Sequence, residues 1–338
     1  MRVLAGDIGG TNARLAIVDV GPAGTRVIRK RRLPSRDYPG LAPMVRAFLA
    51  EVGETPSRAC FGIACPVVDG RCSPTNLSWS VDIETLPAEI GIPWATVIND
   101  LHAVGYGVQR LSADDFVTLQ AGVPDEHGAI AIIAAGTGLG QAFLTRDGDD
   151  YRVHHSEGGH ASFSPRNDLE WELHRSLAQR FGHVSCEHVL SGPGLVRIYR
   201  QLAAGAAASD RSRIEAEMES EDPAAVIARH ALDGSDATCV RALDVFASVY
   251  GAQAGDLALT VMATGGVYVA GGIAPRIVQK LTDGTFTTEF RDKGRLSQIL
   301  ARVPIRVIVN RGVGLLGAAT VAARLSPRPT RSATGGVT

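Results

Sequence analysis

One pattern occurs twice in this chain and limits what the chain can fold into. Residues 2–8 and 13–20 predict two β-strands joined by a glycine-rich turn, and residues 129–145 repeat that plan with the sequence AIAIIAAGTGLGQAFLT. Two unrelated hairpins would not be expected to share this layout. Internal repetition on this scale predicts two related domains that face each other, with one glycine turn from each converging on a shared ligand.

The remaining hydrophobic periodicity indicates a mixed α/β chain, and 338 residues are enough for two domains. After an antiparallel meander that ends with residues 26–33, we expect strands over 59–64 and 94–99. Helices are expected over 41–52, 101–111, 168–181, 238–262 and 311–325, the last capped by Asn310. Residues 326–338 lack periodicity and bulky apolar side chains, so we expect a disordered tail.

The charge composition argues against nucleic acid or a membrane as a partner. The 34 Lys and Arg residues are balanced by 35 Asp and Glu residues, so no net positive field draws the protein to nucleic acid or anionic lipid. The densest basic run, residues 29–32, reads as the end of a strand. Residues 257–275 carry no charge, but glycines and Pro275 divide them into a helix end, a turn and a short strand, so we expect no membrane span.

The cysteines and the N-terminus favour the cytoplasm. Five cysteines without any C-x-x-C pair fit neither a disulfide framework nor a cysteine zinc site, and the histidines are spaced unlike any zinc motif. The first residues lack the basic and apolar regions of a secretory signal peptide. We therefore expect a protein of the reducing cytoplasm without dedicated metal ligands.

The first glycine turn has the composition of a phosphate site. Its residues are Gly6, Asp7, Ile8, Gly9, Gly10, Thr11 and Asn12. Glycines allow backbone N–H groups to approach an anion closely, and a carboxylate beside phosphate oxygens makes sense if a divalent cation lies between them. A plain β-hairpin is the alternative for this segment alone. The second turn, which contains Gly136, Thr137 and Gly138, favours the phosphate site.

Other nucleotide-binding motifs are missing from the sequence. The chain contains no G-x-x-x-x-G-K-[ST] motif and no kinase H-R-D loop, and neither turn satisfies G-x-G-x-x-G. What remains is phosphate held by backbone amides from two turns together with a metal ion. A third turn, Gly271 and Gly272 after an apolar strand, suits close approach to a base or ribose, and a role in helix packing is its alternative.

Polar residues at three further places suit a small polyol. Asn99 and Asp100 end a strand where a helix starts, so Asp100 is either simply an N-cap or a carboxylate placed to accept a hydroxyl proton. Glu157 and His160 are separated only by glycines and can both hydrogen-bond a polyol, or they lie in a plain exposed loop. Glu187 lies at another helix start, where an acid is normally structural.

These segments together resemble the bacterial glucokinase family, ATP-dependent hexokinases with the two-domain actin-like (ribonuclease-H-like) ATPase fold. The resemblance rests on GDIGGTNARLA, IND followed by LHAVGYG, AAGTGLGQAFL, EGGHASFSPRND and CEHVLSGPGLVRIY, in this order, and extends to about residue 325. The related repressor–kinase (ROK) group usually adds a clustered-cysteine zinc motif, which this chain lacks after His160. The implied fold is α/β with an interdomain cleft, a smaller domain of residues 1–110 plus 302–325, and a larger domain of residues 111–301.

The resemblance also implies roles for individual residues. Asp100 would be the general base for the 6-hydroxyl of glucose, and the other hydroxyls would be held by Asn99, Glu157, His160 and Glu187. ATP would bind at the glycine turns with magnesium bridging its phosphates, and the family suggests a homodimer. A kinase for another hexose and a non-catalytic, actin-like nucleotide- or sugar-binding regulator stay open as alternatives.

Overall fold

The computed structural model describes residues 1–22, 24–65, 67–74, 77–204 and 208–326. The chain divides into two compact units, one containing Met1–Leu111 and the segment from Gly312 onward, the other Ser112–Arg311. The second crossing point lies later than residue 302, where we expected it, because the strand β14 (Ile305–Ile308) pairs within the sheet of the second unit. Of the tail expected to be disordered, residues 327–338 lie outside the described residues.

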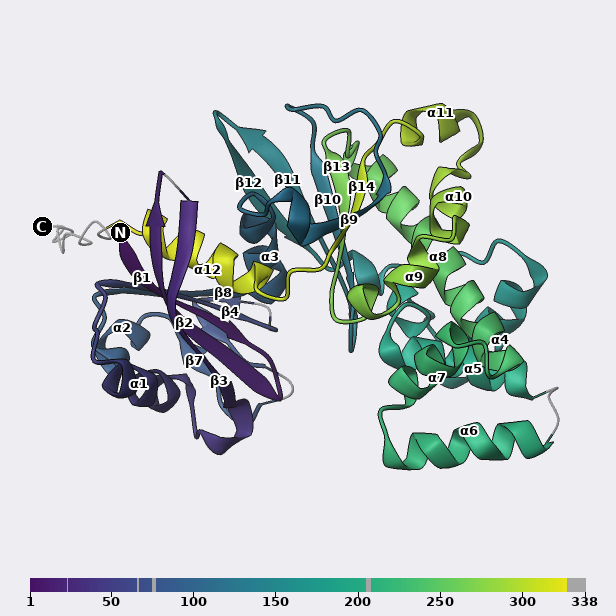
Figure 1. Cartoon of the computed structure of the whole chain (residues 1–338), viewed down its shortest axis with the longest axis horizontal. Coiled ribbons are helices and arrows are strands. Elements are labelled where there is room, and N and C mark those ends of the chain that lie inside the picture. Colours follow the sequence, from purple (N-terminus) through teal and green to yellow (C-terminus); the bar gives the residue numbers. More distant parts are fainter. Residues whose placement is uncertain (23, 66, 75–76, 205–207, 327–338) are drawn as a thin grey trace, which may run out of the picture. The chain divides into compact units, whose positions relative to one another are not determined.

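The first unit is built on a five-stranded sheet with the order β3-β2-β1-β4-β8 (Figure 1). Its strands are β1 (Arg2–Ile8), β2 (Asn12–Gly21), β3 (Gly24–Pro34), β4 (Arg58–Ile63) and β8 (Trp94–Asn99). A small second sheet contains β5 (Val67–Val68), β6 (Arg71–Cys72) and β7 (Val81–Asp82). The helices are α1 (Leu41–Val52), α2 (Leu86–Ile90), α3 (Asp100–Val108) and α12 (Val313–Arg324).

The second unit repeats the plan of the first sheet. Its order is β12-β11-β10-β13-β14-β9, with an antiparallel β10–β11 hairpin and a parallel β10–β13 pair, just as β1 pairs with β2 and β4. The further strands are β9 (Phe116–Gln120), β10 (Ile130–Ala135), β11 (Leu139–Asp147), β12 (Asp150–Ser156) and β13 (Gly266–Ala270). The duplication predicted from the two glycine turns is therefore confirmed at the level of topology.

The helices of the second unit are α4 (Asp168–Phe181), α5 (Gly192–Ala203), α6 (Ala208–Ser220), α7 (Pro223–Leu232), α8 (Ala237–Val261), α9 (Val278–Leu281), α10 (Thr285–Arg291) and α11 (Ser297–Leu300). Of these, α5, α7, α9, α10 and α11 pack against α8, whose buried face forms much of the core. The helices predicted over 41–52 and 168–181 have these bounds in α1 and α4. The uncharged stretch 257–275 is divided between α8 and β13 as expected, and no helix within the described residues is long and apolar enough to cross a membrane.

The structure differs from the sequence-based expectations at Asn310 and at two of the cysteines. Asn310 does not cap the last helix: α12 begins at Val313 after Gly312, and the Asn310 amide instead donates to Asp115 Oδ1 at 2.8 Å. The five cysteines were expected to form no disulfide framework, yet Cys65 and Cys72 are joined by a disulfide, while Cys60, Cys186 and Cys239 are free. Sequence spacing missed the pair because the antiparallel pairing of β5 with β6 brings the two residues together.

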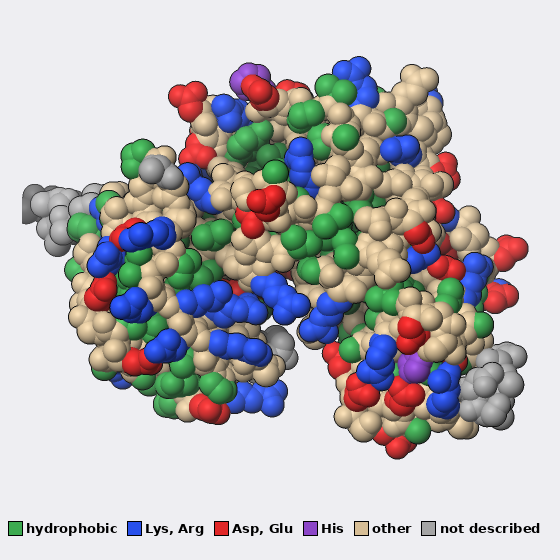
Figure 2. Space-filling view, in the orientation of Figure 1, with side chains coloured by type: hydrophobic (Ala, Val, Ile, Leu, Met, Phe, Trp, Pro, Cys, Tyr) green, Lys and Arg blue, Asp and Glu red, His purple; other side chains and the backbone are tan. Residues whose placement is uncertain are grey.

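The basic run at residues 29–32 lies within β3, the edge strand of the first sheet, and its side chains are exposed. Figure 2 shows Lys and Arg side chains gathered over the first unit. Charged side chains on an edge strand oppose pairing with another chain through the free backbone groups of that strand. The run therefore has a structural explanation, consistent with its predicted place in a strand.

Two glycines allow α12 to pack directly on α3, the helix that begins with Asp100. A Cβ on Gly317 would lie 1.7 Å from the Ala103 carbonyl oxygen, and one on Gly107 would lie 2.0 Å from that of Val313. Both obstacles are backbone atoms, which cannot move aside as a flexible side chain would. The two helices can approach this closely only because these positions lack a side chain.

We expect Gly317→Ala to lower the free energy of unfolding by about 1–3 kcal/mol, because α3 and α12 must separate to admit the methyl group. Urea unfolding followed by circular dichroism measures the loss. Gly314→Ala, in the same helix, is the matched control, since its Cβ would meet only ordinary contacts, 3.6 Å from the Asp7 carboxyl carbon. Equal stability of the two variants would contradict close packing at Gly317.

Candidate functional site

The polar residues predicted in the first unit meet at one edge of its sheet. β1, β4 and β8 run parallel, and their register aligns Ile8 with Ile63 and Ile63 with Asn99. Asp7 and Asp100 therefore lie at the carboxyl ends of these strands, which is the edge where open α/β sheets place their ligands. Residues from two distant sequence motifs share this edge.

Asp100 is the first residue of α3, and Asn99 is its N-cap. The Asn99 Oδ1 accepts hydrogen bonds from the backbone N–H groups of Leu101 at 2.9 Å and His102 at 3.3 Å. The reading of Asp100 as a simple N-cap is thus wrong, because its neighbour performs that role. The Asp100 carboxylate lies on the first turn of the helix, where it accepts the Leu101 N–H at 2.8 Å and a hydrogen bond from the Asn99 side chain.

The surroundings of Asp100 favour a carboxylate of increased basicity. Burial raises the pKa of the Asp100 carboxyl above its ordinary value, and the negative charge of Asp7 raises it further. The hydrogen bond from the Leu101 N–H opposes these effects. A carboxylate whose pKa lies nearer to neutrality is a better general base than an ordinary aspartate.

Hydrogen bonds from Ser35, which follows β3, fix the conformation of the first glycine turn. The buried Ser35 hydroxyl donates to the Gly9 carbonyl at 2.7 Å, and its backbone N–H donates to the Thr11 carbonyl at 3.0 Å. Asp7, at the end of β1, forms an ion pair of 2.7 Å with Arg14 on the paired strand, and Asn12 Oδ1 accepts from Arg32. Fixing the turn in advance reduces the entropy lost when it binds an anion.

The second turn brings a predicted sugar-binding residue against a predicted nucleotide-binding turn. Glu187 Oε2 accepts the Leu139 N–H at 2.9 Å, and a Cβ on Gly138 would lie 2.4 Å from that same oxygen. Gly136 is tied to the turn through its N–H, which donates to the Gly138 carbonyl at 2.8 Å. A side chain at position 138 would therefore displace the Glu187 carboxylate from its contact with the turn.

His160 ends a short 3-10 helix beside this turn, residues Gly158–His160, and Glu157 directly precedes that helix. A Cβ on Gly159 would lie 1.9 Å from the Leu139 carbonyl oxygen, so the glycine lets this segment pack against β11. The side chains of Glu157 and His160 are exposed, and Glu157 Oε2 lies 3.8 Å from His160 Nε2. The backbone N–H of Cys186, the residue before Glu187, donates to the Ala161 carbonyl at 2.9 Å, so the segments carrying Glu157, His160 and Glu187 are adjacent.

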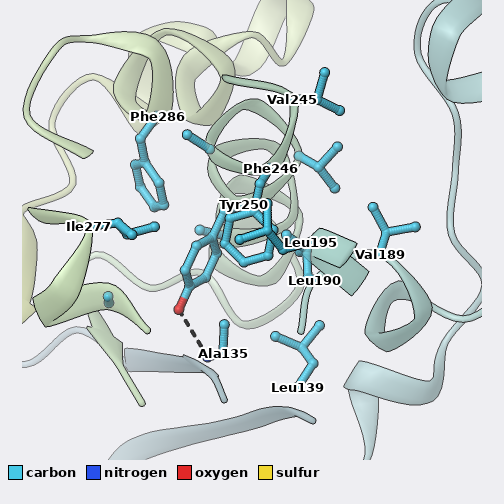
Figure 3. Packing of buried hydrophobic residues seen from close by; sticks show 14 of the residues in the cluster. Ala135, Leu139, Val189, Leu190, Leu195, Val245, Phe246, Tyr250, Ile277 and Phe286 are labelled. Atoms are coloured by element: carbon cyan, nitrogen blue, oxygen red, sulfur yellow. Dashed lines mark hydrogen bonds between the residues drawn. The ribbon is translucent and has the colours of Figure 1, made fainter. Parts of the chain in front are cut away.

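The third turn lies next to the second because β10 and β13 are parallel neighbours, and one buried tyrosine contacts the ends of both strands. The Tyr250 oxygen accepts the N–H of Ala135, the residue before Gly136, at 3.1 Å (Figure 3). Its hydroxyl also lies 3.4 Å from the carbonyl of Ala270, the residue before Gly271. Gly271 has φ of +86°, and a Cβ there would lie 2.3 Å from the Ala135 carbonyl oxygen. The tyrosine and this glycine hold the ends of β10 and β13 together.

A cavity of about 630 Å³ opens beside these two turns. The turns contribute Gly136, Thr137 and Gly272, and the first residues of α5 and α7 also line it. Four arginines that the sequence analysis missed line the same cavity: Arg180, Arg197, Arg200 and Arg276. Arg197 and Arg200 lie one turn apart on α5, but Arg180 and Arg276 come from segments far away in the sequence, so only the fold brings the four together. Two helix N-termini and four guanidinium groups favour an anionic ligand.

The sheet edge of the first unit has carboxylates that could contact a divalent cation, but they do not form a complete protein metal site. The described residues contain no group of three or more His, Cys, Asp or Glu side chains able to hold a metal ion. Asp7, beside the first glycine turn, has a side chain that is about a quarter exposed. One partly exposed carboxylate next to a phosphate turn fits Mg²⁺ that is bound mainly by the nucleotide and keeps most of its water ligands.

Comparison with known proteins agrees with these features. The glucokinase family model matches residues 4–325. Glucokinase of Nostoc sp. is 44% identical, with 96% of this chain and 99% of that protein covered, and glucokinase of Cronobacter sakazakii is 37% identical, with 93% and 95% covered. A crystal structure of glucokinase from an Antarctic psychrotroph has a TM-score of 0.83 and 33% identity, covering 96% of this chain and 99% of its own.

The fold is also shared with more distant sugar kinases. A ROK family glucokinase from Streptomyces griseus, solved in complex with glucose and AMPPNP, has a TM-score of 0.66 at 22% identity, covering 96% of this chain and all of its own. At that identity the likeness shows the actin-like ATPase fold alone. Because the family model and the relatives at 37–44% identity span nearly the whole chain, this protein belongs to the glucokinase family, whose members are ATP-dependent hexose kinases.

Proposed function

We propose that this enzyme transfers the γ-phosphoryl group of ATP to the 6-hydroxyl of glucose, giving glucose 6-phosphate and ADP, with Asp100 as the general base. The observation that carries the proposal is the Asp100 carboxylate, which lies at the ligand-binding edge of a sheet with its pKa raised by burial and by Asp7. Such a group can accept the hydroxyl proton as the sugar oxygen bonds to phosphorus.

The other polar residues act as ligands of the sugar hydroxyls. Asn99, Glu157, His160 and Glu187 can each exchange hydrogen bonds with a polyol, and the carboxylates form the stronger, charge-assisted bonds. The proximity of the segments that carry Glu157, His160 and Glu187 supports a common ligand for these three residues. Asn99 and Asp100 lie next to each other at the sheet edge of the first unit.

The nucleotide occupies the cavity beside Gly136 and Gly272. Its arginines and helix N-termini can neutralise phosphate charge, while the apolar part of the lining, which includes Ile273 and Leu195, suits a base. The turn at Gly6–Asn12 supplies backbone donors for phosphate in the first unit. Phosphoryl transfer passes through a loose transition state, so these groups act by positioning the phosphates and stabilising their charge.

Magnesium accompanies the nucleotide in this proposal. When bound, the ion would neutralise charge on the β- and γ-phosphate oxygens. Asp7 is the side chain placed to orient it, directly or through water, because Asp7 lies beside the first turn and is only partly shielded by Arg14. Asp100 remains responsible for the proton.

The cytoplasm as compartment and a homodimer as assembly are part of the same proposal. Three of the five cysteines are free thiols, which is usual for proteins of a reducing compartment, where a disulfide such as Cys65–Cys72 is uncommon and typically redox-responsive. The homodimer rests on the family resemblance, and sedimentation equilibrium tests it through the mass of the particle compared with 35.5 kDa for one chain.

A coupled ADP-release assay over a panel of sugars tests the proposed reaction. We expect the highest kcat/KM with glucose and lower values with fructose, mannose and N-acetylated hexosamines. A higher kcat/KM with one of the other sugars would assign the enzyme to that acceptor. ADP release with none of them would favour a non-catalytic nucleotide-binding regulator.

We expect Gly136→Ala to raise the KM for ATP about 10-fold, because the methyl group would project into the space that the nucleotide requires. A Cβ at this position meets no protein atom within 4 Å, so the fold should be retained. Steady-state kinetics with ATP as the varied substrate measures the effect. Gly21→Ala is the control, since Gly21 is equally unobstructed but lies at the end of β2. An unchanged KM for ATP would argue against nucleotide at this turn.

A further inference from the structure

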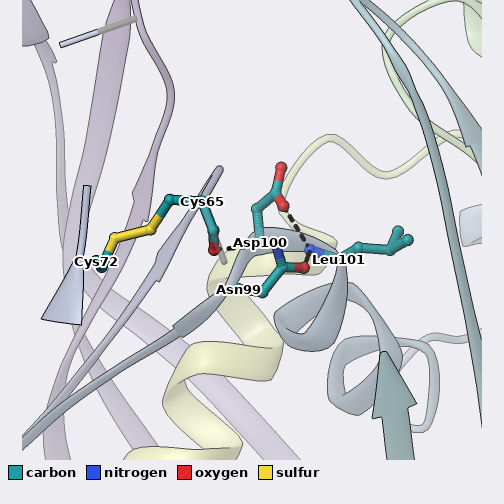
Figure 4. Close-up of a disulfide and its surroundings, with 5 residues drawn as sticks. All are labelled: Cys65, Cys72, Asn99, Asp100 and Leu101. Carbon is teal, nitrogen blue, oxygen red and sulfur yellow. Dashed lines mark hydrogen bonds between the residues drawn. A yellow bond between two sulfur atoms is a disulfide. The ribbon is translucent and has the colours of Figure 1, made fainter. Parts of the chain in front are cut away.

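The Cys65–Cys72 disulfide lies next to the proposed sugar-binding residue Asn99 (Figure 4). Cys65 follows the end of β4, and Cys72 ends β6. Both residues are buried, with 4% and 0% of their surfaces exposed, and both belong to the hydrophobic core of the first unit. The disulfide therefore joins the strand ends that form the ligand edge of the sheet to the small β5–β6 hairpin.

A hydrogen bond connects this disulfide to the site. Asn99 Nδ2 donates to the backbone carbonyl of Cys65 at 3.3 Å, while Asn99 Oδ1 accepts from the first N–H groups of α3. An asparagine amide has two N–H donors and one oxygen. With its oxygen held by the helix and one N–H held by Cys65, the amide has a defined orientation, and the same side chain hydrogen-bonds the neighbouring Asp100 carboxylate and lowers its pKa.

The position of the Cys65 carbonyl depends on what holds Cys65. On one side, the Cys65 N–H donates to the Ile63 carbonyl at 2.8 Å. On the other, its side chain is bonded to Cys72, which pairs with Val67 across the β5–β6 hairpin. The hairpin contains Asp69 and Gly70, both with positive φ, of +49° and +74°. The disulfide thus ties Cys65 to a hairpin whose strands have only two residues each. A sheet this small has few backbone hydrogen bonds of its own, so the disulfide is an important restraint on it.

We propose that Cys65 and Cys72 are positioning residues for the sugar: their disulfide holds the Cys65 carbonyl that orients Asn99, so the oxidised enzyme binds sugar more tightly than the reduced enzyme. Formation of the bond converts two thiols to a disulfide, and a small-molecule disulfide such as oxidised glutathione takes up the two electrons and two protons as two thiols. The inference rests on the proposed function, because it requires Asn99 to contact the acceptor sugar.

The test compares wild-type enzyme treated with oxidised glutathione with enzyme prepared and kept under dithiothreitol. Thiol titration after unfolding reports the state of the pair: three thiols in the oxidised enzyme and five in the reduced enzyme. We expect reduction to raise the KM for glucose about 2- to 10-fold, the effect of weakening one hydrogen bond, with the KM for ATP unchanged. Five thiols after treatment with oxidised glutathione would overturn the proposal.

Variants separate positioning from general stability. Cys72→Ser should show the high KM for glucose of the reduced enzyme and no response to dithiothreitol. Cys60→Ala, which removes a free and buried thiol from β4, should keep the wild-type response. In an Asn99→Ala background, reduction should leave the KM for glucose unchanged, because the residue that transmits the effect is absent.

The outcomes distinguish this proposal from the proposed function. If the oxidised enzyme phosphorylates glucose with the same KM as the reduced enzyme, only the positioning role fails. An equal rise in the KM for ATP and glucose would show that the disulfide merely stabilises the fold, which also overturns the positioning role. If neither redox form phosphorylates glucose, the proposed function fails and this inference fails with it.

Discussion

Replacing Asp100 with asparagine is expected to lower kcat by about 10²- to 10⁴-fold, while glucose and ATP still bind. Asparagine has nearly the same shape but cannot accept the proton of the 6-hydroxyl. Turnover by the coupled assay and sugar affinity by calorimetry measure the two properties separately. Turnover close to that of the wild type would remove Asp100 from the mechanism.

The same variant should be more stable than the wild type at neutral pH. The pKa of Asp100 is raised in the folded state, so the unfolded chain holds fewer protons between the unfolded and folded pKa values of this group. The free energy of unfolding therefore falls as the pH rises through that interval, because the folded state must bury an ionised Asp100. This loss of stability persists at higher pH, and asparagine, which carries no charge, does not cause it. For the same reason, kcat/KM of the wild type should fall on acidification at a higher pH than an ordinary aspartate would cause.

Asp19→Asn is the matched control for both effects. Asp19 lies on the same sheet, but it pairs with Arg2 at the other end of β1 from Asp7. The hydrogen bond from Arg2 lowers the pKa of the Asp19 carboxyl, so its removal should not increase stability. We expect kcat of this variant to be unchanged. A gain in stability in both variants would indicate an effect of net charge.

Replacing Glu157 with alanine is expected to raise the KM for glucose about 10- to 150-fold, which corresponds to the loss of one hydrogen bond to a charged group. The KM for ATP should change little, because the contact described for the Glu157 side chain is with His160 and not with a glycine turn of the proposed nucleotide site. Kinetics with each substrate varied in turn measure the difference. A similar rise in both KM values would contradict a role in sugar binding.

Glu187→Ala provides the comparison that the structure suggests. Glu187 accepts the N–H of Leu139 in the second glycine turn, so its loss should disturb the nucleotide as well as the sugar. We expect both KM values to rise in this variant. The contrast between Glu157 and Glu187 follows from one hydrogen bond that no sequence pattern could reveal.

The repeated glycine turns were the most informative feature of the sequence. Alternation of apolar residues determines strands, and glycine determines where the chain can reverse, so both hairpins and their duplicated topology could be predicted. The exact first and last residues of the helices were harder to predict from the sequence. α3 begins at Asp100 because the Asn99 side chain reaches the Leu101 N–H, and either residue type can cap a helix.

By itself, the sequence determined the α/β class, the duplicated strand–turn–strand plan and the segments that carry the glucokinase resemblance, since these depend on local pattern and order along the chain. The tertiary structure alone decided that four arginines from three separate segments line one cavity, that Cys65 pairs with Cys72, and that Asp7 and Asp100 share a sheet edge. The physical reason is that burial, and with it the shift in the pKa of Asp100, depends on residues brought together by strand pairing and helix packing, and sequence distance does not record this proximity.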